Sequence, residues 1–155
     1  MLVSGVAADK NTARISVLGV KDEPGIAFRV FDYLSAKNIN VDIILQSVGR
    51  DGTKDISFTV SREDLKDALH IIHNNMDSIT AKGVEYEENV AKVSIIGAGM
   101  TSNPGVAAKM FEALYSAGIN IKMISTSEIR ITVLIDEADV NGAMRSVHDA
   151  FGLGN

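Results

Sequence analysis

Cysteine is absent from the 155-residue chain, so it forms no disulfide bond, no zinc–thiolate site and no thiol nucleophile. It also lacks a run of about 18 uncharged apolar residues, the length that a membrane-spanning helix needs. The N-terminal segment 1–6 has neither the basic region nor the unbroken apolar stretch of a secretory signal. We therefore expect a soluble, cytoplasmic protein.

An excess of positive charge is also missing. Fifteen Lys and Arg residues against 20 Asp and Glu residues give a net charge of −5, and the basic residues are scattered along the chain. Nucleic-acid surfaces neutralise phosphates with clustered positive charge, so this balance disfavours a nucleic-acid partner. The chain does contain 46% hydrophobic residues, enough for the core of one domain or of two small ones.

The chain contains an internal repeat. Residues of the first half recur in the second half at three successive spacings, 78, 80 and 75 positions. The recurring pairs include Gly5 with Gly83, Ser16 with Ser94, Pro24-Gly25 with Pro104-Gly105, Phe31 with Phe111, Asp64 with Asp139, and His73 with His148. The spacing changes where loops are expected, because loops tolerate insertions better than packed strands and helices do. The sequence therefore predicts two copies of one fold.

Each copy has the same predicted order of elements. A short extended segment leads through a polar turn, at 9–11 or 87–89, into an apolar strand at 15–18 or 93–96. A helix then starts at Pro24 or Pro104, where a first-turn proline is tolerated. In the first copy, strands at 41–48 and 55–60 follow, joined by a hairpin loop at 49–54. The last element of each copy is a helix with a one-sided apolar stripe.

This β-βαββα order predicts an α+β fold. We expect two ferredoxin-like domains, 1–80 and 81–155, each with a four-stranded antiparallel sheet and helices on one face. The pattern leaves open how the leading strands, 3–7 and 84–88, are used. Each can close the sheet of its own copy or the sheet of the other copy.

Familiar catalytic and cofactor motifs are incomplete in this chain. Gly97-Ala98-Gly99 lies between a strand and a helix, but Ser102 replaces the third glycine of a dinucleotide-binding fingerprint. His70 and His73 have metal-ligand spacing on one helix, yet no third ligand accompanies them, so we expect solvated histidines and no metal. An RNA-recognition module needs exposed aromatic residues on its central strands, and Phe58 is the one aromatic there, within an apolar alternation. No catalytic residues and no cofactors are predicted.

The loops between the first strand and the first helix of each copy are the remaining candidate sites. Free N–H groups at a helix start attract a carboxylate, and a side-chain oxygen accepts from an ammonium group, so such a loop suits a zwitterion. Copy one carries Asp22 in this loop and Gln46 near the end of its second strand, where copy two has the shorter Ser102 and Thr126. The first loop is therefore expected to be the stronger amino-acid site. The alternative is that Pro-Gly merely starts the helix.

Four segments carry a family resemblance: 41–46 (VDIILQ), 91–100 (AKVSIIGAGM), 125–131 (STSEIRI) and 146–151 (SVHDAF). With the duplicated fold, they resemble the regulatory region of aspartate kinase, also called aspartokinase. This region is a tandem pair of ACT domains, found as a separate beta subunit or as part of a longer chain. The resemblance implies feedback control of the ATP-dependent phosphorylation of aspartate that leads to lysine, threonine and methionine. Alone, the chain is expected to bind an effector and not to phosphorylate aspartate.

The resemblance also implies where the effector binds. In the family, it lies between the first-unit loop of one chain and the second unit of its partner, which implies a homodimer through the ACT domains. Asp22 or Gln46 would take the ammonium group, and Asn120 would meet the effector side chain. The motif assigns one wall to Asp22, Gly25, Ile26, Ala27 and Gln46, with backbone N–H groups near Ile26 and Ala27 holding the carboxylate, and the other wall to Asn120 and Ile121.

A second, quasi-equivalent site would involve Met100, Ala107, Thr126 and Ser127. Ala107 stands where lysine-binding family members carry a polar residue, so threonine is the expected effector and lysine the alternative. The further partner implied by the resemblance is the catalytic alpha subunit or an amino-kinase domain. Two other classes stay open: a ligand-free ACT-type dimerisation module of another amino-acid biosynthetic enzyme, and an enzyme built on a ferredoxin-like scaffold.

Overall fold

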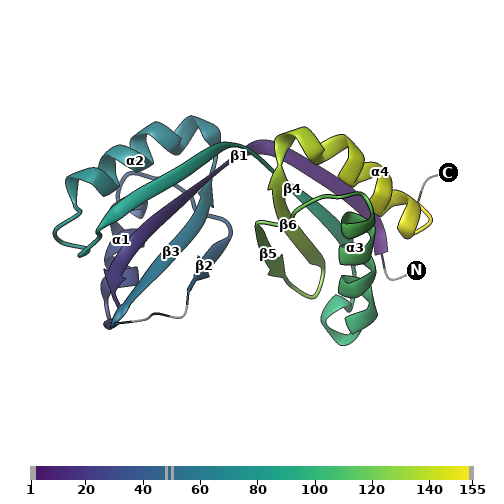
Figure 1. Cartoon of the computed structure of the whole chain (residues 1–155), viewed down its shortest axis with the longest axis horizontal. Helices are drawn as coiled ribbons and strands as arrows, with labels where there is room; N and C mark the ends of the chain where they lie inside the picture. The colour runs from purple at the N-terminus through teal and green to yellow at the C-terminus, as the bar shows by residue number, and fades with distance from the viewer. Residues whose placement is uncertain (1–2, 48, 50, 154–155) are drawn as a thin grey trace. The chain divides into compact units, whose positions relative to one another are not determined.

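A computed structural model describes residues 3–47, 49 and 51–153, and across them it has six strands and four α-helices (Figure 1). The strands are β1 (Val3–Lys21), β2 (Ile44–Gln46), β3 (Thr53–Val60), β4 (Gly83–Gly97), β5 (Met123–Thr126) and β6 (Arg130–Asp136). The helices are α1 (Ile26–Ser35), α2 (Leu65–Asn74), α3 (Pro104–Ser116) and α4 (Val140–Ala150). The predicted α+β class is confirmed. No helix among the described residues is long and apolar enough to cross a bilayer.

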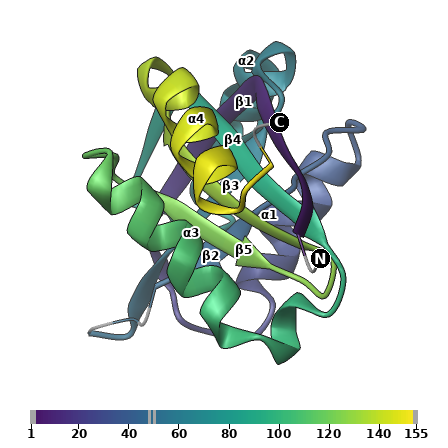
Figure 2. The same ribbon diagram turned by 90° about the vertical axis from the view of Figure 1, so that its right-hand side faces the viewer.

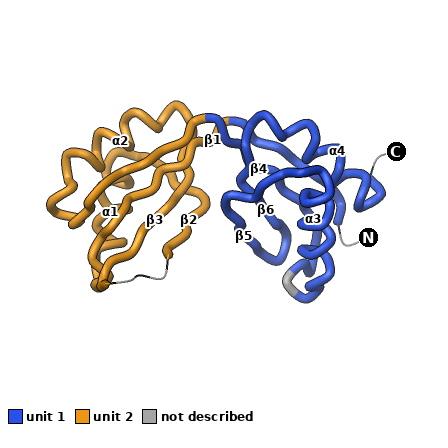
Figure 3. The backbone as a smooth tube through the Cα atoms, in the orientation of Figure 1, with its two compact units in different colours: residues 1–10, 89–155 blue, residues 11–88 orange. Residues whose placement is uncertain are grey.

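The chain divides into two compact units, shown in separate colours in Figure 3. Unit 2 holds residues 11–88 with the strand order β2-β3-β1-β4, and unit 1 holds residues 1–10 and 89–155 with the order β1-β4-β6-β5. Both β1 and β4 therefore contribute to both units. Residues 3–10 lie with the second repeat and residues 83–88 with the first, whereas the repeat boundaries alone suggested domains 1–80 and 81–155.

The turns predicted at 9–11 and 87–89 are wrong. Both segments continue as strand, within the 19-residue β1 and the 15-residue β4. Their polar residues make contacts between the two strands: Arg14 pairs with Glu87 in unit 2, and Asp9 pairs with Lys92 in unit 1. The two polar runs that look like turns in the sequence are therefore stretches of strand, and their charged side chains form ion pairs with the neighbouring strand.

β1 and β4 run antiparallel within each unit. In unit 2, the N–H of Lys82 donates to the carbonyl of Leu18 at 2.8 Å. In unit 1, the hydroxyl of Ser4 donates to the carbonyl of Ile96 at 3.2 Å. A leading strand from one repeat thus lies beside the first apolar strand of the other repeat.

The core of unit 2 lies between one face of the sheet and its two helices. Alternating residues of β1 face the helices and pair with apolar residues of β3, as Ile15 does with Phe58. Phe31 of α1 meets the Phe58 ring edge-on, with ring centroids 5.5 Å apart. The buried helix residues fall on one-sided stripes: Ile26, Val30 and Leu34 on α1, and Leu65, Ala68 and Ile72 on α2. These stripes are the ones that the sequence periodicity predicts.

Unit 1 repeats this arrangement. Val93 and Ile95 of β4 pair with Val133 and Ile131 of β6, and all four are buried. Figure 2 shows α3 and α4 lying over one face of these strands. The buried helix residues are Met110 and Leu114 on α3, and Val140, Ala143 and Val147 on α4.

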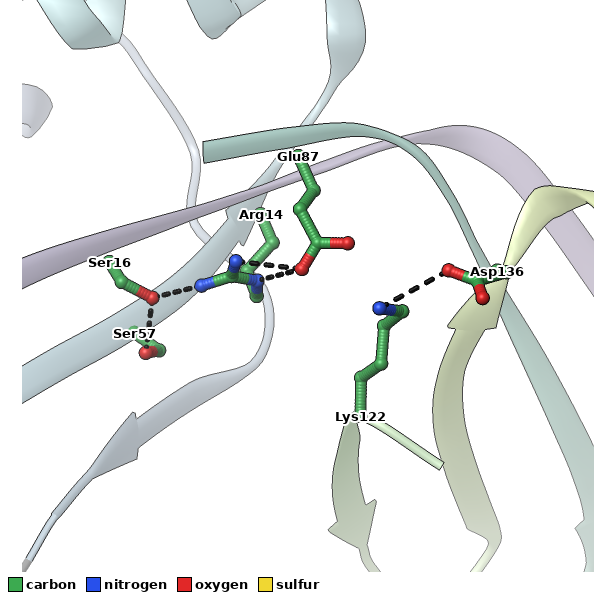
Figure 4. A network of polar contacts seen from close by, with 6 residues as sticks. All are labelled: Arg14, Ser16, Ser57, Glu87, Lys122 and Asp136. Atoms are coloured by element: carbon green, nitrogen blue, oxygen red, sulfur yellow. Dashed lines mark hydrogen bonds and ion pairs between the residues drawn. The ribbon is translucent and has the colours of Figure 1, made fainter. Parts of the chain in front are cut away.

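The face of the strands opposite the helices carries a hydroxyl pair in each unit, part-buried in unit 2 and buried in unit 1. Ser16 and Ser57 are 2.6 Å apart in unit 2, and their counterparts Ser94 and Thr132 are 2.7 Å apart in unit 1. Ser16 also accepts from the guanidinium of Arg14, as Figure 4 shows. The repeat therefore extends to polar side chains, which satisfy each other across the strands.

Candidate functional site

The two helix-start loops differ although both contain Pro-Gly. In unit 2, Gly25 has a left-handed φ of 94° and precedes α1, so Pro24 lies outside the helix. In unit 1, Pro104 is the first residue of α3, and Gly105 lies inside the helix. The predicted first-turn proline is therefore confirmed for Pro104 and wrong for Pro24. A left-handed residue cannot continue a helical hydrogen-bond pattern, which shortens α1 at its start.

Several hydrogen bonds hold the loop before α3. Met100 N–H donates to the carbonyl of Glu128 at 2.9 Å, and the side-chain amide of Asn103 donates to the carbonyl of Gly99 at 3.0 Å. The N–H of Val106 then donates to the carbonyl of Asn103 at 3.0 Å. Gly99 has a φ of 63°, which favours glycine. This loop fixes the start of α3 against the turn between β5 and β6.

A pocket of about 210 Å³ opens between the start of α3 and the end of β5, and we call it the α3–β5 pocket. Its lining residues are Met100, Asn103, Pro104, Ala107, Thr126, Ser127 and Ile131. All four residues that the sequence assigned to the second quasi-equivalent site are among them. The structure brings these four together from α3, β5 and the two loops that flank them.

Three lining residues were not named for this site from the sequence: Asn103, Pro104 and Ile131. The repeat held a signal for the first two, since Asn103 and Pro104 correspond to Glu23 and Pro24 at the helix start of the first repeat. Ile131 reaches the pocket because it pairs with Thr126 across the β5–β6 hairpin. That register depends on the length of the hairpin loop, which no sequence periodicity fixes.

Polar and apolar side chains together line the α3–β5 pocket. Thr126 and Ser127 supply hydroxyl groups, and Asn103 supplies an amide. Ser127 is held in place because its N–H donates to the carbonyl of Arg130 at 2.8 Å. None of the seven lining residues carries a charged side chain. The start of α3 adds the positive end of a helix dipole, which favours a carboxylate.

The predicted first site lies in unit 2, around the start of α1. Asp22 is exposed, and its carboxylate lies 3.3 Å from the Lys54 ammonium group. Its backbone N–H donates to the carbonyl of Gly52 at 2.8 Å, so β3 and its preceding turn position the loop. Gln46 is exposed at the end of β2.

The remaining predicted residues of the first site differ in exposure. Ile26 is only 3% exposed and packs in the core, so its side chain is not available to a ligand. Ala27 is half-buried and Gly25 is exposed. Asn120 and Ile121 belong to unit 1, between α3 and β5; Asn120 is exposed and Ile121 packs partly buried against the core of that unit.

Two predicted strand and loop segments include residues that the structure does not describe. The predicted strand 41–48 is observed as β2 over Ile44–Gln46, and Val48 lies outside the described residues. The predicted hairpin loop 49–54 contains Arg50, which also lies outside them, and β3 begins at Thr53. Asp51 and Gly52 have φ values of 57° and 74°, as a tight hairpin turn requires.

The histidines of α2 do not form part of a metal cluster. His70 contacts the side-chain amide of Asn74 at 3.1 Å through its Nε2 atom. Within the described ranges, no three His, Asp or Glu side chains group so that they could hold a metal ion.

Comparisons with known proteins identify the fold. The model of the ACT domain family matches residues 15–76 and 93–151. The aspartokinase of Helicobacter pylori is 50% identical over 155 aligned residues, which cover 98% of this chain but 37% of the length of that protein. The chain thus spans little more than a third of the curated relatives that it matches.

Solved structures of regulatory subunits match over nearly their whole length. A chain in the crystal structure of aspartokinase alpha and beta subunits is 49% identical with a TM-score of 0.91, and the match covers 97% of this chain and 99% of that one. The ligand-free regulatory subunit of aspartate kinase from Thermus thermophilus is 42% identical with a TM-score of 0.91, covering 96% of this chain and 99% of that one. The predicted resemblance is confirmed by these matches.

Proposed function

Because this chain belongs to the ACT domain family, in the branch of aspartokinase regulatory regions, we propose that it binds a free amino acid and thereby regulates aspartate phosphorylation. The catalytic step itself resides in another subunit or domain of aspartate kinase, which is the proposed partner. The observation that carries the proposal is the α3–β5 pocket, where four residues assigned from sequence line one small cavity at a helix start.

Threonine is the effector that the α3–β5 pocket suits best. Its carboxylate would lie at the start of α3, and its hydroxyl matches the hydroxyl and amide groups of Thr126, Ser127 and Asn103. Its methyl group matches the apolar lining residues Met100, Ala107 and Ile131. Lysine is disfavoured there, because the lining has no carboxylate for a second ammonium group, whose burial without a partner is costly.

The loop before α1 is proposed as the other site, with a different recognition of the ammonium group. Asp22 already holds a cation, since Lys54 lies 3.3 Å away, and an effector ammonium would compete for the same carboxylate. Gln46 offers an amide oxygen at the end of β2. Asn120 and Ile121 from a second copy of the chain would complete this site, which makes the homodimer part of the proposal.

Exposed apolar side chains on the edge strands support association of two copies. β2 and β5 each have one strand neighbour in the pairing order, so each leaves backbone groups available to a further strand. Ile44 and Leu45 of β2 are 47% and 49% exposed, and Ile124 of β5 is 45% exposed. An edge strand with such side chains suits strand addition by a partner. The same feature supports the alternative of a dimerisation module without a ligand.

Regulation would follow from linkage between effector binding and the arrangement of the dimer. An effector that bridges two copies favours the arrangement in which its site is complete, by as much as its affinity differs between arrangements. A coupling free energy of about 1–3 kcal/mol is typical of such systems. That range corresponds to a several-fold to hundred-fold change in the affinity for the effector between the two arrangements, or in the inhibition of the catalytic part.

Calorimetry of the chain with threonine, lysine and methionine tests the proposal. Threonine is expected to raise the melting temperature and to shift the sedimentation profile toward a dimer, because a bound effector stabilises the folded dimer by mass action. A dimer that forms equally without any amino acid, together with no thermal shift from any of the twenty, would instead establish the ligand-free dimerisation module.

A further inference from the structure

An ion pair lies in unit 2 at the first predicted effector site, beside the start of α1. The Lys54 ammonium group is 3.3 Å from Oδ1 of Asp22, and Lys54 was not among the residues named for this site from the sequence. The two partners differ in burial, since the Asp22 side chain is 52% exposed and the Lys54 side chain is 15% exposed. Lys54 is therefore packed in place, whereas its carboxylate partner is open to a ligand.

The strand register places Lys54 on the sheet face that α1 and α2 cover. Lys54 is two residues before Ile56 in β3, so the two side chains share a face. Ile56 is buried in the core of unit 2, between the sheet and its helices. Gln46 pairs with Ile56 across β2 and β3, so it lies on this face as well. Lys54 and Gln46 thus come from neighbouring strands to the same part of one sheet face.

Backbone contacts hold the two partners of the ion pair in position. Lys54 pairs with Val20 of β1, two residues before Asp22. The N–H of Asp22 donates to the carbonyl of Gly52 at 2.8 Å. The next carboxylate of β3, that of Asp55, accepts from the N–H of Gly19 at 2.9 Å. The strand β3 and the loop before α1 therefore build the Asp22–Lys54 pair together.

The internal repeat shows that this pair is specific to unit 2. At the repeat spacings, Asp22 corresponds to Ser102 and Lys54 corresponds to Ile129, which is 61% exposed. Unit 1 thus has neither charge at these two positions, although Ile56 and its counterpart Ile131 are the same residue. The paired change indicates that the lysine belongs with the loop carboxylate rather than with the strand framework.

A free amino acid carries the same two charges as this ion pair. Its ammonium and carboxylate groups are attached to one carbon atom, so they lie about as close together as the groups of a contact ion pair. If the ammonium replaced Lys54 beside Asp22 and the carboxylate replaced Asp22 beside Lys54, every charge would keep a partner. A ligand with an ammonium group alone would leave the mostly buried Lys54 without a partner, which is costly.

We propose that Lys54 determines the specificity of the first site for zwitterions by an exchange of partners. The effector ammonium takes Asp22, and the effector carboxylate takes Lys54. This role of Lys54 rests on the proposed function, because it concerns the effector site before α1. Lys54 shares the carboxylate with the backbone N–H groups at the start of α1, and Gln46 adds its amide oxygen for the ammonium group. An amine without a carboxylate only competes with Lys54 for Asp22.

The test compares threonine with threoninol, in which an alcohol replaces the carboxylate. The whole chain is titrated with each compound, and the backbone amide shifts of unit 2 are followed in NMR spectra. Threonine should bind at least about thirtyfold more tightly than threoninol, because the alcohol forms no charge-assisted contacts. Lys54→Gln should lower this ratio about tenfold, the contribution of one charge-assisted hydrogen bond, without weakening the binding of threoninol.

Two further variants separate charge from structure. Lys54→Arg keeps the positive charge and should keep the ratio within about threefold of the wild-type value. Lys92→Gln is the matched control in unit 1, because the Lys92 side chain is 17% exposed and pairs with Asp9 at 3.7 Å. It removes an ion-paired lysine of similar burial and should leave the ratio unchanged.

The proposal is overturned if threoninol binds the wild-type chain as tightly as threonine does, a comparison that needs no variant to fold. It is also overturned if Lys54→Gln tightens both compounds equally, since Lys54 would then only compete for Asp22, or if Lys54→Gln and Lys92→Gln act alike. Threonine still binds in each of these cases, so the proposed effector function stands. Absence of any threonine response, in unit 2 and at Thr126 and Ser127, would instead overturn the effector function itself.

Discussion

Ile79→Ala tests how far the core of unit 2 depends on the turn that follows α2. Ile79 is 1% exposed within the core cluster of unit 2. The change removes three carbon atoms, worth about 2.4 kcal/mol at about 0.8 kcal/mol per buried methylene, and leaves a cavity that adds to this cost. We expect a destabilisation of about 3–4 kcal/mol, within the range measured for large-to-small core substitutions of about 2–5 kcal/mol.

Native-state hydrogen exchange separates the effect on the two units. A loss of about 3–4 kcal/mol raises the exchange rates of the most protected amides by about two to three powers of ten, since about 1.4 kcal/mol is tenfold. Amides of α1 and β3 should show this increase, and amides of α3 and β6 much less. Leu153→Ala is the matched control in unit 1, because Leu153 is only partly buried there. The reasoning is refuted if Ile79→Ala costs less than about 1 kcal/mol, or if Leu153→Ala costs as much.

Two further predictions concern the proposed effector sites. Asp22→Ala or Gln46→Ala should weaken threonine binding about tenfold or more, because each removes an acceptor for the ammonium group. Ser102→Ala should change threonine binding less than about threefold. Equal effects in isothermal titration calorimetry would contradict the asymmetry of the two loops. Ala107→Leu should fill the α3–β5 pocket and lower the number of threonine molecules bound per chain without abolishing binding. An unchanged stoichiometry would show that the pocket is not a threonine site.

The sequence predicted the parts of the fold that depend on periodicity. The apolar stripes of the four helices are observed as expected, because one-sided burial leaves a direct trace in the order of residues. The family resemblance supplied four of the residues that line the α3–β5 pocket. The helix stripes need only local pattern, whereas the pocket residues needed the motifs that carry the resemblance.

Features that depend on contacts across the sheet were not accessible in this way. The polar runs at 9–11 and 87–89 resemble turns, and only the pairing of Asp9 with Lys92 and of Glu87 with Arg14 explains why the strands continue. The two Pro-Gly pairs start their helices differently, since Gly25 adopts a left-handed φ and Gly105 does not. Neither difference is encoded in residue types at those positions alone.

The two ion pairs between β1 and β4 make a last prediction, because they are repeat equivalents with different geometry. Arg14 donates from Nε and Nη2 to one carboxylate oxygen of Glu87, at 3.0 and 2.7 Å, and its side chain is 16% exposed. Lys92 approaches Asp9 at 3.7 Å. The Lys92 side chain is 17% exposed, much like Arg14, whereas the Asp9 side chain is 54% exposed against 35% for Glu87. Two charge-assisted hydrogen bonds on a part-buried guanidinium should give a coupling energy of about 1–2 kcal/mol in a double-mutant cycle. The Lys92–Asp9 pair is longer and has the more exposed carboxylate, so it should give less than about 0.5 kcal/mol. Cycles built from Arg14→Gln with Glu87→Gln, and from Lys92→Gln with Asp9→Asn, measure both by urea unfolding. Equal couplings would mean that hydrogen-bond geometry and burial do not decide how strongly each exchanged strand is held.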